Sequence, residues 1–204
     1  MIAGSGNYAE GSVNTINGNV NKAIGDWNFI DGDKNLAAGD GNKLAGNCNE
    51  VVGSTNLLVG NNNGVNGNQN VLVGNQNALQ GSQNTVAGSH NALIGNQNNL
   101  IGGSNVVAGS NNNVNGNLNN LLGNTNTVFG QANQVVGNQN LAAGTANSII
   151  GSTNTAIGGS NAIFGNGNTA AGVLNTAIGT GNTAIGAQNT VWVLATLLWV
   201  TTTL

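Results

Sequence analysis

A seven-residue register of asparagine and glycine runs through nearly the whole chain. Every residue whose number is a multiple of seven is Asn, from Asn7 to Asn189, which makes 27 consecutive positions. Gly keeps a second register from Gly4 to Gly186, and the residue two after each Asn is always apolar. The unit is therefore Asn-x-apolar-x-Gly-x-x. A disordered low-complexity chain has no reason to keep such a register, so the pattern predicts an ordered repeat protein.

A heptad can also indicate a coiled coil, but this one does not. A coiled coil needs two apolar positions per heptad, with good helix formers between them. Each heptad here carries a Gly, which costs a helix about 1 kcal/mol every time. A collagen helix is excluded as well, because its Gly must recur at every third residue.

A short strand followed by a turn fits the unit. Side chains alternate along a strand, so the Asn and the apolar residue would point inward and the two residues beside the apolar one outward. Gly and Asn both tolerate the left-handed backbone of a turn. Two heptads would then close one 14-residue coil with two strands and two turns. We therefore predict an all-β fold for residues 1–190, a two-sheeted parallel β-solenoid with alternate heptads on opposite sheets.

The inward asparagines are expected to stack from coil to coil as a ladder. An amide side chain can donate to one neighbour, accept from the other and also bond the turn backbone. Such a ladder satisfies polar groups that would be costly to bury alone. The sequence predicts this structural role for the whole register, including Asn84, Asn91, Asn98, Asn126 and Asn154.

The charges are few and lie at one end. There are nine, all within residues 1–50, and the net charge is −3. Three Lys and no Arg cannot neutralise a useful run of phosphates, so nucleic acid is not an expected partner. The charged coils should keep the N-terminal end soluble. A cation site at Asp26, Asp31, Asp33 and Asp40 is the alternative, but the calcium-binding nonapeptide repeat is absent, so no metal site is predicted.

The single Cys and the single His also predict no chemistry. Cys48 and His90 both directly precede a register Asn, in a turn slot, and neither has a ligand or triad partner at a matching spacing. No Gly is followed by the Lys-Ser or Lys-Thr of a phosphate loop. We therefore expect no enzyme, no catalytic residue and no cofactor.

The final segment, 191–204, loses the Asn and the Gly. It is apolar, with Thr196 and Thr203 in the ladder slot, and we predict that it caps the solenoid or docks a partner. Its apolar run is too short for a transmembrane span, which needs about 20 residues. No secretory signal opens the chain.

The heptads resemble those of grass ice-binding proteins, which inhibit ice recrystallisation. The likeness is carried by Gly81-Ser-Gln-Asn84-Thr-Val86-Ala-Gly88, Gly88-Ser-His-Asn91-Ala-Leu93 and Gly123-Asn-Thr-Asn126-Thr-Val128-Phe-Gly130. The resemblance implies an asparagine-laddered β-roll whose flat Thr- and Val-rich face binds ice. Those proteins often carry Ser directly before the Gly, where this chain mostly carries Ile, Val, Ala or Phe.

A second, local resemblance is to the head repeats of trimeric autotransporter adhesins. It rests on Asn175-Thr-Ala-Ile-Gly179 and Asn182-Thr-Ala-Ile-Gly186. It implies a parallel β-roll that buries one face against other copies. We expect an extracellular or cell-surface protein.

Both predicted outer faces are flat and largely apolar, and they carry no charge after Glu50. Because a soluble monomer rarely exposes so large an apolar strip, we expect a partner. The first hypothesis is ice or ordered water, bound by Thr at a fixed repeat. The alternative is a self-assembling fibre subunit or adhesin head that pairs with copies through the flat faces or the C-terminal strands. Thr and Ile are also simply good strand residues. The candidate face residues are Thr127, Thr155, Ile157, Thr169, Thr183 and Ile185 on one sheet, with Thr176 and Ile178 on the other.

Overall fold

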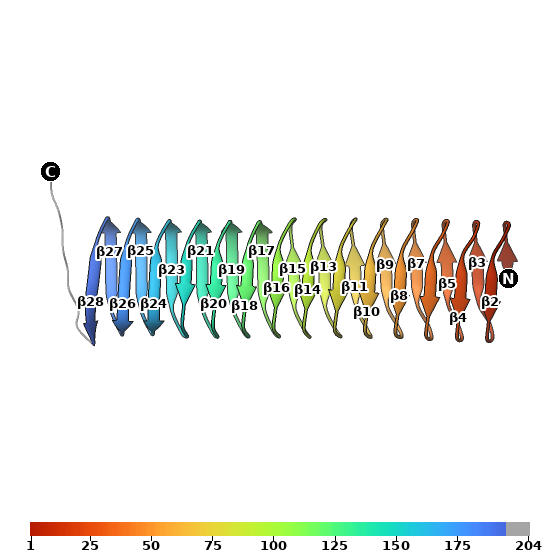
Figure 1. Ribbon diagram of the computed structural model, residues 1–204, viewed down its shortest axis with the longest axis horizontal. Helices are drawn as coiled ribbons and strands as arrows, with labels where there is room; N and C mark the ends of the chain where they lie inside the picture. Colours follow the sequence, from red (N-terminus) through yellow and green to blue (C-terminus); the bar gives the residue numbers. More distant parts are fainter. Residues whose placement is uncertain (195–204) are drawn as a thin grey trace. The chain divides into compact units, whose positions relative to one another are not determined.

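The computed structural model describes residues 1–194, which form 28 short strands and no helix. The chain divides into two compact units, Met1–Ser104 (unit 1) and Asn105–Leu204 (unit 2). In each unit, odd-numbered and even-numbered strands alternate and belong to separate parallel sheets (Figure 1). The predicted all-β, two-sheeted parallel solenoid is therefore confirmed. No helix within residues 1–194 is long and apolar enough to cross a membrane.

Unit 1 contains eight odd-numbered and seven even-numbered strands, each paired with the next strand of its own sheet. The odd sheet consists of β1 (Ile2–Ala3), β3 (Thr15–Asn17), β5 (Phe29–Asp31), β7 (Lys43–Ala45), β9 (Leu57–Val59), β11 (Val71–Val73), β13 (Thr85–Ala87) and β15 (Asn99–Ile101). The even sheet consists of β2 (Tyr8–Glu10), β4 (Lys22–Ile24), β6 (Leu36–Ala38), β8 (Glu50–Val52), β10 (Gly64–Asn66), β12 (Ala78–Gln80) and β14 (Ala92–Ile94).

Unit 2 repeats the arrangement with six odd-numbered and seven even-numbered strands, several of them longer. The odd sheet consists of β17 (Asn113–Asn117), β19 (Thr127–Gln131), β21 (Leu141–Thr145), β23 (Thr155–Gly159), β25 (Thr169–Val173) and β27 (Thr183–Ala187). The even sheet consists of β16 (Val106–Ala108), β18 (Asn120–Leu122), β20 (Gln134–Val136), β22 (Ser148–Ile150), β24 (Ala162–Asn166), β26 (Thr176–Thr180) and β28 (Thr190–Leu194). Most of the predicted C-terminal cap, from residue 195 on, lies outside the described residues.

The pairing register is 14 residues throughout. Leu72 of β11 has Leu58 of β9 and Val86 of β13 as its Cα partners. In unit 2, Thr169 of β25 has Thr155 and Thr183 as partners. Each coil is thus two heptads, as the sequence predicts.

The core is one apolar residue thick on each side, and the two sides share its volume. From β2 to β11 in unit 1, a smaller residue on the even sheet accompanies a larger one in the following odd strand, as with Ala23 and Ile30. From β18 to β25 in unit 2 the order is reversed, as with Ile163 and Ala170. All four are fully buried. In these coils the pair, rather than either residue alone, fills the thin core.

Two residues per heptad hold the turn in a left-handed conformation. One is the register Gly, for example Gly88 at φ 139°, where an added Cβ would overlap the carbonyl group of Gly102. The other is the residue directly before the ladder Asn, which keeps φ between 53° and 69° even where it is Val or Thr. Asn also takes this left-handed position where it occupies the turn slot, as at Asn62 and Asn111. The ladder asparagines have ordinary backbone angles, because their side chains must point inward.

Candidate functional site

The inner ladder satisfies every polar atom of a typical ladder amide. Asn126 is 1% exposed; its backbone N and its Nδ2 donate to Asn112 Oδ1 at 2.9 and 3.1 Å. The same Nδ2 donates to the carbonyl oxygen of Gly137 at 2.8 Å. Its own Oδ1 accepts from the backbone N and Nδ2 of Asn140 at 3.0 and 3.1 Å. Each amide therefore bonds the coils on both sides, and the predicted ladder is confirmed.

The other named ladder residues lie in the same buried register. Asn84 donates to Asn70 and Gly95, Asn91 to Asn77 and Gly102, Asn98 to Asn84, and Asn154 to Asn140 and Gly165. The ladder gives the outer faces a rigid support, since an inward amide fixes every turn on both edges of the coil.

A second, exposed ladder lies outside the turns, and the sequence analysis missed it. Where the residue after a register Gly is Asn, Asp or Ser, its side chain typically accepts a hydrogen bond from the backbone of the preceding coil. Ser110 N donates to Asn124 Oδ1 at 2.8 Å, and Asn124 N donates to Asn138 Oδ1 at 2.9 Å. The signal was present, because this slot holds Ser, Asn or Asp in most heptads up to Asn166.

The acidic residues considered as a cation site belong mainly to this outer ladder. Asp26, Asp33 and Asp40 accept backbone N–H groups one coil away, at 2.6 to 2.7 Å. Asp31 accepts from the side chain of Asn17 at 2.9 Å. These oxygens are engaged in turn stabilisation, and residues 1–194 bring no group of three His, Cys, Asp or Glu side chains together.

In unit 2, loss of the outer ladder lengthens the strands. Where the residue one coil on is not Asn, Asp or Ser, the turn backbone of this unit continues the sheet pairing, as between Gly159 and Val173. The odd strands of unit 2 are five residues long for this reason, whereas those after β1 in unit 1 have three. Along the strand direction, the odd sheet of unit 2 is therefore wider than the odd sheet of unit 1, and it carries no charged residue. Its outer-ladder slots hold Asn117, Gln131, Thr145, Gly159, Val173 and Ala187.

The structure brings six of the eight predicted face residues onto this sheet. Thr155, Thr169 and Thr183 are consecutive Cα partners on β23, β25 and β27, and each is half-buried. Thr127 lies in the same column with Leu141 between. The parallel outer column holds Ile157 and Ile185, both exposed, with Ala171 between them. We call these six residues, Thr127, Thr155, Ile157, Thr169, Thr183 and Ile185, the Thr face.

The remaining two predicted residues lie on the opposite sheet. Thr176 and Ile178 belong to β26, where their Cα partners are Ala162 and Phe164 on β24. The predicted set therefore does not form one surface.

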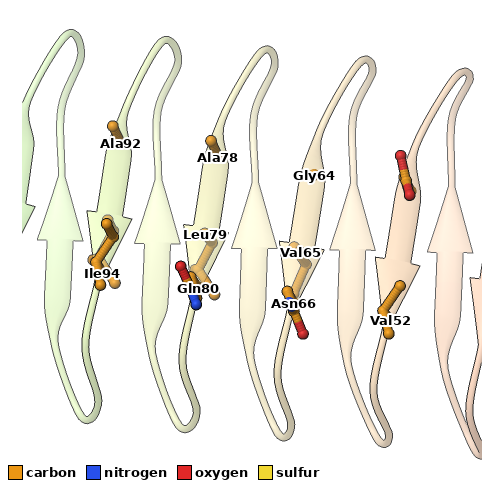
Figure 2. Close-up of a pocket in the computed structure, with 11 residues that line it drawn as sticks. Val52, Gly64, Val65, Asn66, Ala78, Leu79, Gln80, Ala92 and Ile94 are labelled. Atoms are coloured by element: carbon orange, nitrogen blue, oxygen red, sulfur yellow. The ribbon is translucent and has the colours of Figure 1, made fainter.

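The even sheet of unit 1 is not flat. A hollow of about 400 Å³ forms where Gly64, Ala78 and Ala92 follow one another in one outward column. Figure 2 shows these small residues in one row, with Asn66 and Gln80 in the other. Because its side chains differ in size from strand to strand, this surface has no unbroken column like that of Thr155, Thr169 and Thr183.

Three further titratable residues, Cys48, His90 and Tyr8, lie at exposed positions. Cys48 and His90 are exposed turn residues with φ of 57° and 62°. Tyr8 donates a hydrogen bond to Glu10 at 3.1 Å, and that carboxylate raises the pKa of the phenol above its ordinary value. All three residues belong to unit 1.

Comparison with known proteins points to one family. No curated protein matches the chain. Residues 24–109 match the family described as grass antifreeze beta roll. The matched segment runs from β4 to the turn after β16, so it ends before Thr127. Over residues 24–109 this asparagine-laddered solenoid is therefore similar to the grass antifreeze beta rolls, and the resemblance read from its heptads is confirmed.

Proposed function

We propose that this protein binds ice through the Thr face, without catalysis. Support at the level of the family comes from the match over residues 24–109. Support for the face itself comes from one observation, the unbroken column of Thr155, Thr169 and Thr183 in strict Cα register.

The column repeats at the strand spacing of about 4.8 Å. Each Thr offers a methyl group and a hydroxyl group, and the residue two positions on, an exposed Ile or the half-buried Ala171, adds a second apolar row. Uncharged groups held at fixed spacing can order a layer of water, whereas a mobile side chain would lose rotamer entropy on contact. The inner ladder supplies that rigidity. Such a role would place the protein in an extracellular or cell-surface location, which stays a prediction.

The test compares two identical pentapeptides on opposite sheets. Asn154-Thr-Ala-Ile-Gly158 carries Thr155 on the Thr face, and Asn175-Thr-Ala-Ile-Gly179 carries Thr176 on the even sheet. Ice-recrystallisation inhibition is measured on purified full-length protein. We expect activity in the unmodified protein, a loss of about tenfold or more in Thr155→Lys, and little loss in Thr176→Lys.

Circular dichroism controls for folding in both variants, since both threonines are half-buried. If Thr176→Lys lost more inhibition than Thr155→Lys, the result would indicate that ice binds to the even sheet instead. Absence of inhibition by the unmodified protein at high concentration would refute the proposal.

A further inference from the structure

The even sheet of unit 2 carries a continuous stripe of large apolar side chains. Five of its six members are between 36% and 71% exposed, and Val136 is half-buried. They occupy the second outward position of consecutive strands in strict register. We call them the apolar stripe: Leu122, Val136, Ile150, Phe164, Ile178 and Trp192.

We infer that this sheet pairs face to face with the same sheet of a second copy of the chain, with the two solenoid axes antiparallel. Exposed apolar surface of this continuity is typical of an interaction site. The corresponding column of the Thr face is different, since Ala143 and Ala171 interrupt its larger residues.

The outward column beside the stripe also argues against ice on this sheet. It passes from Asn120 through Gln134, Ser148 and Ala162 to Thr176, so that length and chemistry change at almost every coil. An irregular surface cannot match a lattice, but it can interdigitate with side chains of a protein.

A second copy is the occupant that fits the charge and the symmetry. No charged residue follows Glu50, so nothing on the face selects a charged partner. A two-fold axis parallel to the strands reverses the solenoid axis and lays the stripe of one copy along the stripe of the other. With the axis between the two central members, Ile150 faces Phe164 of the second copy. The outer members then pair Val136 with Ile178 and Leu122 with Trp192.

The area is sufficient for a weak dimer. Seven strands at about 4.8 Å, each counted as about five extended residues at 3.3 Å because the flanking Asn and Gly also bond between coils, give a footprint of roughly 550 Å² per copy. The total of roughly 1,100 Å² lies just above the size expected of a specific interface. We therefore expect a dissociation constant in the micromolar range.

Two phenylalanines of nearly equal exposure provide a matched test. Phe164 on the stripe is 40% exposed, and Phe129 on the odd sheet is 43% exposed. Sedimentation equilibrium of the full chain should give a concentration-dependent shift from 20.2 kDa to twice that mass. Phe164→Lys should raise the dissociation constant at least about 100-fold, and Phe129→Lys should leave it within about threefold.

A charge-exchange experiment tests the antiparallel register. Ile150→Lys alone and Phe164→Glu alone should both be monomeric, because each buries an unpaired charge. Their equimolar mixture should dimerise, since the two new charges face each other only when the axes are antiparallel. A parallel arrangement sets each position opposite itself and predicts no rescue.

Other outcomes would overturn the inference. A monomer up to about 500 µM, a mass that grows without limit, or equal disruption by Phe129→Lys would each do so. The inference does not depend on ice binding. Dimerisation without ice activity would refute only the proposed function, and ice activity in a monomer would refute only the dimer.

Discussion

The side-chain oxygen of Asn112 accepts two hydrogen bonds from Asn126, one from the backbone nitrogen at 2.9 Å and one from Nδ2 at 3.1 Å. A single amide thus fixes both the turn and the side chain of the next coil. The outer ladder, two residues away at Asn124, bonds the same turn from the solvent side.

The two ladders should respond differently to one chemical change. Asn126→Asp replaces a buried donor by a carboxylate that faces Asn112 Oδ1 and the Gly137 carbonyl, so we expect a loss of about 3 kcal/mol or more. Asn124→Asp should change stability by less than about 1 kcal/mol, because Asp already serves in this slot at Asp26 and Asp33. Denaturant unfolding at pH 7 measures both.

Acid should relieve the Asn126→Asp defect. Burial raises the pKa of the introduced carboxyl above its unfolded value of about 3.9. The defect is therefore full above the folded-state pKa and shrinks as the pH falls toward the unfolded value. A pH-independent defect would show that the carboxylate had escaped to solvent.

Register glycines should tolerate no Cβ, whereas a strand glycine should. Gly88→Ala would push a methyl group into the backbone of the next coil at φ 139°, so we expect a loss above about 4 kcal/mol or failure to fold. Gly64→Ala meets nothing within 4 Å and should stabilise by about 0.5 kcal/mol. Thermal unfolding compares the two, and equal effects would contradict the stacking of the turns.

The turn slot before a ladder Asn offers a stabilising substitution. Val20 is exposed and holds a φ of 56°, which a β-branched residue adopts at a cost of about 1–2 kcal/mol. Val20→Asn should raise the unfolding free energy by about 1 kcal/mol, since Asn tolerates this region. The same change at the exposed strand residue Val59 should not stabilise, because Asn is a poor strand former.

The shared core volume predicts strong coupling between Ile163 and Ala170, which lie on the contacting strands β24 and β25. Ile163→Ala should cost about 2–4 kcal/mol through a cavity, and Ala170→Ile about 1–3 kcal/mol through overpacking. The double variant restores the order of Ala23 and Ile30, so its loss should be well below the sum. Simple additivity would show that the two sheets fill their halves of the core independently.

Much of the fold could be predicted because its rules are local and repeat 27 times. Strand, turn, inward Asn and inward apolar residue each follow from seven residues, and strict periodicity removes any ambiguity of register. The left-handed conformation of residues such as Val20 could not be predicted, because its intrinsic preference is for a strand. The stacked coil imposes it through the Val20 N–H bond to the Ser5 carbonyl at 2.9 Å.

The candidate site was predictable only in part. Because alternate heptads lie on opposite sheets, the sequence alone places Thr155 and Thr176 on different sheets. The Cα register confirms that separation. The heptad pattern did not lead us to predict that side chains such as Asn124 would form an outer ladder. It also does not show that Val173, in the same slot, would leave the strand free to lengthen.

The sequence by itself determined the 14-residue coil, the inward asparagines and the uncharged outer faces, because each depends on which residue stands at which position of the heptad. Only the tertiary structure decided the left-handed turn slot, the outer ladder and the exposure of the Thr face and the apolar stripe. Those features arise from backbone groups of neighbouring coils that must satisfy one another, and a heptad taken alone has no neighbour.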